Sequence, residues 1–436
     1  MSLSDSSTAD ASGHEIIQPG IAEATSVWAT IGLLSFGGPA AQIALMHRLI
    51  VDEKRWLSER QYLDALGFCM LLPGPEAMQL ATYAGWRLHG LRGGLIAGLL
   101  FVVPGALLVL LLSSVYVMYG KLPIVETLFL GVQAAVLVIV VQALIKVAKR
   151  ALDGWGDVLT ALAAFIALFV FTLPFPIVIA GAALFGWLRH QLKPAAPSAL
   201  PTVKVRPLLT LITIGIGLTL WWLPVWAVDH WLPGSVLSDI GRFFSTLAVV
   251  TFGGAYAVLA YLAQDVVNLH GWLSPEEMID GLGLAETTPG PLILVTEFVG
   301  FIAGFRHGGW QMGVAGAAMT LWVTFIPCFL WIFAGAPWIE WLNAQPRLRA
   351  ILSAITAAVV GVMLNLSLWF AVHVLFGQVG GLEYGPVTLL WPDLSSLDWQ
   401  ALIIAVAAAV LTFWQRWPVT AVLGSSAVLA LLLSVI

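Results

Sequence analysis

The chain alternates long apolar runs with short polar connections over almost its whole length. Four apolar elements, at 22–50, 61–89, 240–262 and 277–303, are interrupted by glycine or proline. Nine other runs are uninterrupted, near residues 93–118, 125–147, 156–172, 175–189, 208–228, 311–334, 349–375, 399–413 and 418–435. Because a membrane-spanning helix needs about 20 apolar residues, the pattern predicts thirteen helical membrane elements, four of them broken.

The composition indicates the same class of protein. The 436 residues are 60% hydrophobic and only 10% charged, with a mean hydropathy of +0.94. Soluble domains carry about 25% charged residues, so we expect an all-α polytopic membrane protein whose main surroundings are the lipid bilayer. The net charge of −5 and the lack of a basic stripe argue against nucleic acid as a partner. Cys69 and Cys328 lie in separate apolar runs without metal-ligand spacing, so we expect neither a disulfide nor a bound metal.

The interruptions occur twice, at a constant shift of 216 residues. Phe36-Gly37-Gly38 recurs as Phe252-Gly253-Gly254, and Pro73-Gly74-Pro75 recurs as Pro289-Gly290-Pro291. Over residues 36–75 this shift gives 15 identities in 40 positions. Seven elements separate a residue from its counterpart, and an odd number reverses its orientation. The sequence therefore predicts two inverted-topology repeats, related by a two-fold axis in the membrane plane.

This repeat divides the chain into five parts. Residues 1–20 form a polar tail that we expect to be disordered, and they lack the basic segment of a secretory signal. Residues 21–189 form the first repeat, and 190–207 form a basic, proline-rich linker. Residues 208–228 form a connecting transmembrane helix, and 229–436 form the second, inverted repeat.

The distribution of basic residues favours broken elements that re-enter the membrane without crossing it. If all thirteen elements cross, the 19 Lys and Arg residues divide 12 against 7 between the two sides. If each broken pair re-enters, 16 lie on one side, and only Lys121, Arg242 and Arg306 lie on the other. Cytoplasmic loops are enriched in Lys and Arg. We therefore expect re-entrant or half-crossing elements and a cytoplasmic N-terminus.

The broken helices provide candidate binding groups within the membrane. Glycine permits non-helical torsions, and proline lacks an N–H and fits the first turn of a new helix. The free amides at such a helix start carry a partial positive charge that suits an anion. Packing and kinking alone remain the alternative role for these residues. The candidate substrate-binding residues are Gly37, Gly38, Pro39, Gly74, Pro75, Glu76, Gln79, Arg87, Gly253, Gly254, Thr288, Gly290 and Pro291.

Acidic residues near the breaks differ between the two repeats. Glu76 corresponds to Leu292, Glu286 to Met70, and Glu297 to Ala81. Ionisable groups at membrane depth are costly and are therefore functional candidates, so Glu76, Glu286 and Glu297 are candidate proton-coupling groups. A purely structural carboxylate at a helix start is the alternative for Glu76. For Arg87, extension to the membrane surface is the alternative to oxyanion binding.

The chain resembles the long, two-domain form of the chromate ion transporter family. The resemblance rests on Phe36-Gly37-Gly38-Pro39, Trp56-Leu57, Pro73-Gly74-Pro75-Glu76 and Gly85-Trp86-Arg87-Leu88-His89-Gly90, and on the second Phe-Gly-Gly and Thr288-Pro289-Gly290-Pro291. One departure is visible, because Ala41-Gln42 stands after the first Gly-Gly-Pro where the family usually has histidine. Any binding role of that histidine is therefore in doubt here.

The resemblance implies a secondary transporter of the inner (plasma) membrane that exports chromate and confers chromate resistance. It implies no cofactor, a membrane potential or proton gradient as the energy source, and sulfate as a competing substrate. An anion channel or a transporter of sulfate or another inorganic oxyanion remains the alternative, and a homodimer is left open as the assembly. No H-E-x-x-H or G-x-S-x-G motif occurs, so we do not expect an enzyme.

Overall fold

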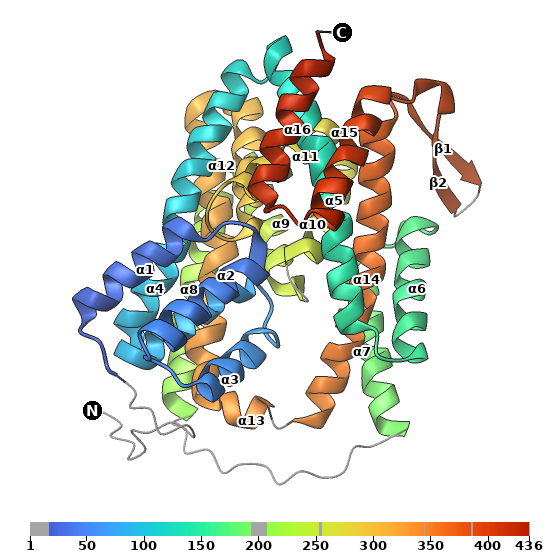
Figure 1. Cartoon of the computed structure of the whole chain (residues 1–436). Coiled ribbons are helices and arrows are strands. Elements are labelled where there is room, and N and C mark those ends of the chain that lie inside the picture. The colour runs from blue at the N-terminus through green and yellow to red at the C-terminus, as the bar shows by residue number, and fades with distance from the viewer. Residues whose placement is uncertain (1–16, 193–206, 253–254, 344, 385–386, 436) are drawn as a thin grey trace.

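The computed structural model describes residues 17–192, 207–252, 255–343, 345–384 and 387–435 (Figure 1). These residues are mainly helical, which confirms the all-α class. Within the described ranges the strands form one antiparallel hairpin, β1 (Val379–Tyr384) with β2 (Val387–Pro392). The sequence pattern did not predict this hairpin. Gly377, Gly380 and Gly381 do not favour continuation of the preceding helix, and the backbone groups pair across the hairpin instead.

Sixteen α-helices are present in the described part of the chain. They are α1 (Ile21–Leu34), α2 (Gly38–His47), α3 (Glu59–Cys69), α4 (Glu76–Tyr119), α5 (Pro123–Ala151), α6 (Trp155–Phe169), α7 (Phe175–Leu192), α8 (Pro207–Trp231), α9 (Val236–Val250), α10 (Ala255–Gln264), α11 (Pro275–Thr287), α12 (Val295–Gly335), α13 (Ile339–Asn343), α14 (Pro346–Leu375), α15 (Trp399–Ala409) and α16 (Val419–Leu433). Most of the predicted tail and linker, residues 1–16 and 193–206, lies outside the described residues.

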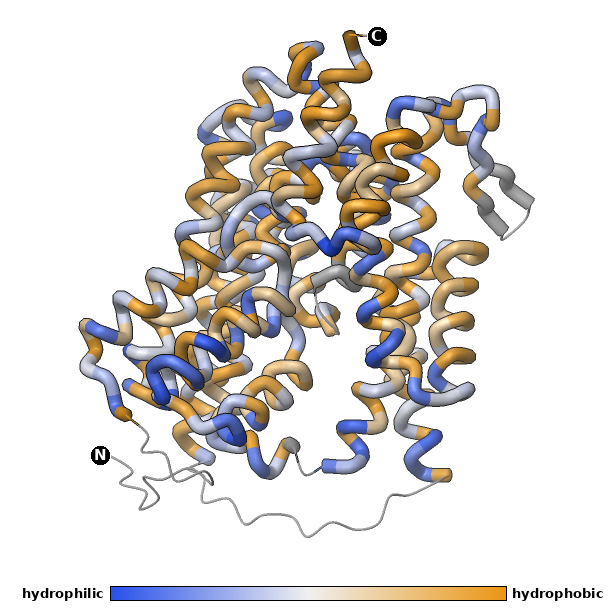
Figure 2. Tube along the Cα trace, in the orientation of Figure 1, coloured by the Kyte–Doolittle hydropathy of each residue, from blue (hydrophilic) through white to orange (hydrophobic). Residues whose placement is uncertain are grey.

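Five helical segments are long and apolar enough to cross a membrane, which agrees with a multi-pass membrane protein. They are α4, α5, α8, the segment Leu292–Leu342 that contains α12, and α14. Hydrophobic residues predominate along these helices (Figure 2). By contrast, α1, α2 and α3 have 14, 10 and 11 residues. At about 1.5 Å per residue, none of the three spans a hydrocarbon core of ~30 Å by itself.

The two longest helices each fold back on themselves. In α4 the helical torsions fail at His89 and Gly90, where Gly90 has φ +60°. The two arms of this helical hairpin approach closely, since a Cβ on Gly85 would lie 2.3 Å from the carbonyl oxygen of Gly93. In α12 the reversal falls at Gly308 and Gly309, which has φ +68°. Small residues at such contacts let two membrane helices pack backbone against backbone.

The two halves of the chain are interlocked. The helix α5 of the first half packs against α15 and α16 of the second, while α14 of the second half packs against α6 and α7 of the first. This exchange is visible in Figure 1. A reciprocal arrangement is what a two-fold relation between similar units produces.

Hydrogen bonds between the interrupted segments also join the two halves in a reciprocal way. The N–H of Gly74 donates to the carbonyl oxygen of Thr251 at 2.8 Å, and the N–H of Gly290 donates to that of Ser35 at 2.9 Å. Both donors and both acceptors are related by the shift of 216 residues. The breaks therefore fasten the two halves to each other. The direction of the two-fold axis relative to a membrane remains a prediction.

The two Pro-Gly-Pro segments lead into different structures. Pro75 is the N-cap of α4, which begins at Glu76. Pro291 instead precedes a 3-10 turn, Leu292–Leu294, and α12 begins only at Val295. A carboxylate in the first turn stabilises the free amides of a helix start. Glu76 supplies one in α4, whereas the turn after Pro291 contains no acidic residue.

Candidate anion-binding cavity

Two adjoining cavities lie where α2, α5 and the chain around residues 412–420 meet. One has a volume of about 410 Å³ and is also lined by Glu76 and by Ser353 and Thr356 of α14. The other has a volume of about 650 Å³. Their walls share Gly37 and Lys146. We refer to the two together as the basic cavity.

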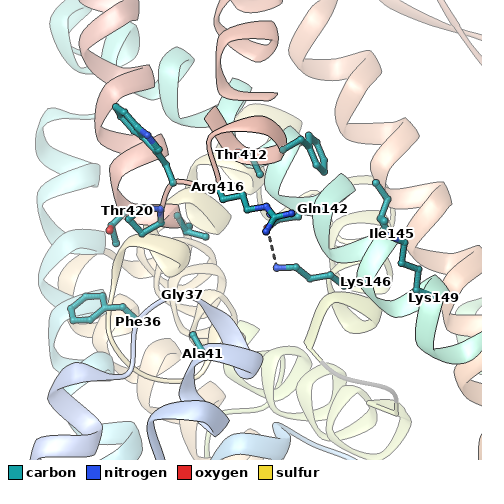
Figure 3. A pocket seen from close by; sticks show the side chains of 14 residues that line it. Phe36, Gly37, Ala41, Gln142, Ile145, Lys146, Lys149, Thr412, Arg416 and Thr420 are labelled. Carbon is teal, nitrogen blue, oxygen red and sulfur yellow. Dashed lines mark hydrogen bonds between the residues drawn. The ribbon is translucent and has the colours of Figure 1, made fainter. Parts of the chain in front are cut away.

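Four cationic side chains line the basic cavity. Lys146, Lys149 and Arg150 come from the C-terminal part of α5, and Arg416 comes from the connection before α16. Residues three and four apart share one face of a helix, so the end of α5 presents its charges together. Figure 3 shows Arg416, Gln142 and Lys146 converging on the side of the cavity opposite Gly37. The ammonium group of Lys146 donates to Oε1 of Gln142 at 3.2 Å.

The start of α2 forms part of the same wall. The chain leaves α1 at Leu34 and turns through Gly37 and Gly38, which have φ values of +83° and +79°. The ten-residue helix α2 then begins at Gly38, with Pro39 in its first turn and no side-chain cap. Its first amides lack partners within the helix. They add a partial positive charge to the cavity wall.

A buried hydroxyl group also lacks a partner in this wall. Thr412 is 5% exposed and lines the larger cavity. Its Oγ1 has no hydrogen-bond partner among the residues that the structure describes. Buried polar groups are nearly always hydrogen-bonded, so this hydroxyl marks an unsatisfied donor and acceptor behind the cavity wall.

Two carboxylates face the same space. Glu76 and Asp153 line the smaller cavity together with Lys146 and Arg150. Four cations against two carboxylates leave the basic cavity positively charged overall, with the start of α2 in addition. The arrangement suits a small oxyanion, and Glu76 is placed to compete with that anion for the cationic groups.

The structure brings together only part of the predicted site. Gly37, Gly38, Pro39 and Glu76 all line the basic cavity. Arg87 is exposed and does not line it. Gly253 and Gly254 lie outside the described residues.

The remaining predicted residues lie in the buried connections between the halves. Gly74, Pro75, Gly290 and Pro291 are buried there. The amide of Gln79 donates to the carbonyl oxygen of Pro73 at 2.7 Å. The hydroxyl of Thr288 donates to the backbone carbonyl oxygen of Ala285 at 3.1 Å.

The proton-coupling candidates also separate in space. Glu76 lines the basic cavity, whereas Glu286 and Glu297 are buried at 3% and 1% exposure and do not line it. Oε2 of Glu297 has no hydrogen-bond partner in the described part of the chain. The three carboxylates therefore do not form one cluster around the cavity.

Gln42 in α2 connects the two halves of the chain. Its buried amide donates to the carbonyl oxygens of Ser35 at 3.2 Å and Gly290 at 2.7 Å. It thereby joins the first break to the second Pro-Gly-Pro segment. It does not line the basic cavity.

The cationic residues of the cavity were not among the predicted site residues. By sequence, Lys146, Lys149, Arg150 and Arg416 are only four of the basic residues at the ends of apolar elements. The spacing of Gln142, Lys146 and Lys149 at the end of an apolar run was the available signal, since it places all three on one helix face. Nothing in the sequence indicated that Arg416 meets them.

A protein-family model described as "Chromate transporter" matches residues 22–187 and 238–431, which together are most of the chain. The chain belongs to the chromate transporter family. This is a family of transporters, not of enzymes. The family match spans both halves that share the Phe-Gly-Gly and Pro-Gly-Pro segments.

Similar proteins are known from several bacteria. The probable chromate transport protein of Synechococcus elongatus is 29% identical over 402 residues, which cover 90% of this chain and 95% of the relative. The chromate transport protein of Pseudomonas aeruginosa is 34% identical over 344 residues, or 76% of each chain. That of Cupriavidus metallidurans is 29% identical over 341 residues, covering 76% of this chain and 78% of the relative. No solved structure matches the chain.

Proposed function

We propose that this protein exports chromate from the cytoplasm across the inner membrane and thereby confers chromate resistance. The observation that carries the proposal is the basic cavity, where four cations and the start of α2 surround one space. Chromate is a small dianion with four oxygens, so it can accept hydrogen bonds from several directions at once. Sulfate has the same charge and shape and is the expected competitor.

The proposed direction rests on charge. The basic cavity contains the Lys and Arg residues of the end of α5, which the positive-inside rule assigns to the cytoplasm. At an inside-negative potential, moving each negative charge outward is favoured by about 2.3 kcal/mol per 100 mV. Voltage alone can therefore drive export of a dianion. Exchange against protons is the proposed additional source of energy, and Glu76, Glu286 and Glu297 are the candidate groups that the sequence pattern named.

An anion channel could use the same site, but the buried apolar part of α5 favours a carrier. Residues 134–138, between the basic cavity and the other end of α5, are all buried apolar residues. A packed apolar segment opposes passage of an ion through this conformation. A carrier that alternates between two conformations fits this arrangement better than an open pore.

Everted membrane vesicles test the proposal directly. Their cytoplasmic face is on the outside, so an exporter moves its substrate into the vesicle lumen. We expect saturable, potential-dependent accumulation of chromate and competition by sulfate. Vesicles without the protein are the control. Absence of accumulation would refute chromate as the substrate, and single-channel currents in planar bilayers would favour the channel.

Sidedness is tested by labelling. The side chain of Lys54 is 41% exposed and forms an ion pair with Glu23 at 2.8 Å. In a Lys54→Cys variant we expect an impermeant maleimide to label everted vesicles and not intact spheroplasts. Both native cysteines are buried, so the parent protein is the background control. Labelling only in spheroplasts would contradict a cytoplasmic location for this loop and the re-entrant topology.

A further inference from the structure

A separate cavity of about 690 Å³ lies toward the other end of α5. It is lined by Glu126 and Gln133 of α5, Tyr116 of α4, and three acidic residues of α11, Glu276, Glu277 and Asp280. We call it the acidic cavity. Its residues on α5 fall between 126 and 133, whereas the basic cavity uses residues 139–151 of the same helix. Since α5 is long enough to cross a membrane, the two cavities lie toward opposite membrane surfaces.

Asp280 is a buried carboxylate in the wall of the acidic cavity. It is 6% exposed. The hydroxyl of Tyr116 donates to one of its oxygens at 2.7 Å, and the amide of Gln133 donates to the other at 2.7 Å. Both donors are uncharged and come from the first half of the chain. Arg306, a cation in the same wall, forms an ion pair with Glu277 at 2.6 Å instead.

The repeat makes the burial of Asp280 informative. Its counterpart in the first half is Asp64, whose side chain is 61% exposed and lies 3.8 Å from Arg60. The same residue type at the same place in the repeat is thus on the surface in one half and enclosed in the other. Burying a carboxylate costs free energy unless hydrogen bonds or an opposite charge offset that cost. A buried carboxylate within a membrane protein is therefore a candidate for a functional group.

We propose that Asp280 is the proton-binding group of this transporter, loaded through the acidic cavity, and that its proton moves inward as the oxyanion moves outward. This inference rests on the proposed function. A proton binds one carboxylate oxygen of Asp280 to form a neutral carboxyl group, and its release toward the cytoplasm restores the carboxylate. Tyr116 and Gln133 hold the group in place, and the acidic residues at the cavity wall attract cations toward it.

The charged and titratable groups in the wall around Asp280 come from several helices and one loop. They are Glu276 and Glu277 on α11, Tyr116 on α4, Lys121 on the loop after it, Glu126 on α5 and Arg306 on α12. His373 on α14 does not line the cavity and interacts with Glu276. No titratable residue lies on α16, another helix in contact with α11. Any pH dependence measured for transport therefore has to be assigned with an Asp280 variant.

The test is the steady-state chromate ratio across everted vesicles with the voltage held at zero by potassium and valinomycin. If one proton is exchanged per chromate, each pH unit of lumenal acidification changes this ratio about tenfold, because one pH unit is a tenfold ratio of proton activity. We expect this response in the parent protein and in Asp64→Asn, the repeat counterpart. In Asp280→Asn we expect voltage-driven chromate uptake to persist and the pH response to disappear.

The outcomes separate the two proposals. No chromate uptake by the parent protein under any gradient refutes the proposed function. Voltage-driven uptake without a pH response in the parent, or an unchanged response in Asp280→Asn, refutes the role of Asp280 and leaves chromate transport standing. A merely structural role for Asp280 would lower the amount of protein or its thermal stability and would not abolish coupling in the folded fraction.

A second test uses the parent protein and therefore does not require that the Asp280→Asn variant folds. Dicyclohexylcarbodiimide reacts with protonated carboxyl groups in apolar surroundings, and site-resolved mass spectrometry identifies the residue. We expect labelling at Asp280 that falls as the pH is raised, with loss of the pH response in the labelled protein. No labelling of Asp280 at any pH, with the other carboxyls serving as internal references, would overturn the proposal.

Discussion

Lys146→Gln is expected to raise the chromate concentration for half-maximal transport by about tenfold to 100-fold. Lys146 lines both parts of the basic cavity, so its ammonium group can contact an anion in either. A hydrogen bond to a charged group contributes about 1.5–3 kcal/mol, and about 1.4 kcal/mol is a factor of ten in affinity. Glutamine keeps most of the side-chain length and removes the charge. The measurement is the concentration dependence of initial uptake in everted vesicles.

Lys54→Gln is the matched control for this change. Lys54 is a partly exposed lysine that forms an ion pair with Glu23 and lines neither the basic nor the acidic cavity. We expect its half-maximal concentration to equal that of the parent protein. An unchanged value in Lys146→Gln, at equal amounts of protein in the membrane, would exclude the basic cavity as the binding site.

Gly74→Ala is expected to reduce the rate of transport by about tenfold or more while the protein still inserts into the membrane. Gly74 has φ +123°, a conformation that costs a residue with a side chain about 1–3 kcal/mol. A Cβ there would lie 2.7 Å from Nε2 of Gln79 and 2.9 Å from Sγ of Cys328. The change would therefore displace the connection that carries the hydrogen bond to Thr251 and leads into Glu76. A displacement on the order of 1 Å at a site can cost up to about 100-fold in rate.

Gly67→Ala provides the comparison for a glycine without these restraints. Gly67 lies within α3, and nothing is found within 4 Å of the position that a Cβ would occupy. Alanine is favoured over glycine in a helix by up to about 1 kcal/mol, so transport should be unchanged and thermal stability equal or higher. Measuring both quantities for the two purified variants separates a local effect from general destabilisation. Normal transport by Gly74→Ala would contradict the role given to this break.

The sequence predicted the framework well where the signal was local. Glycine and proline restrict the torsions of their own residues, so the break at Gly37 and Gly38 and the one at Gly74 could be located from the residues themselves. Apolar length identified α5 and α14 as membrane helices for the same reason. The pattern did not distinguish the 3-10 turn after Pro291 from the first turn of a helix, because both begin after the same Pro-Gly-Pro segment.

Only part of the candidate site, the basic cavity, could be found from the sequence, because its members come from distant elements. Glu76 was identified because an acidic residue within an apolar run stands out by itself. Lys146 and Arg416 are ordinary residues at helix ends, and only the packing of α16 against α5 brings them to one cavity. Arg87 had the right chemistry but is exposed outside that cavity.

By itself, the sequence determined that this chain is a polytopic helical membrane protein with two similar halves and paired breaks, because these properties depend on composition, spacing and single-residue torsions. The tertiary structure decided how the halves interlock, which charges share a cavity, and why Asp64 is exposed while Asp280 is buried. Those facts depend on contacts between residues far apart in the chain. The same residue type at equivalent positions of the two halves can thus lie on the surface or between helices. Which of the two occurs depends on the helices of the other half that pack around that position.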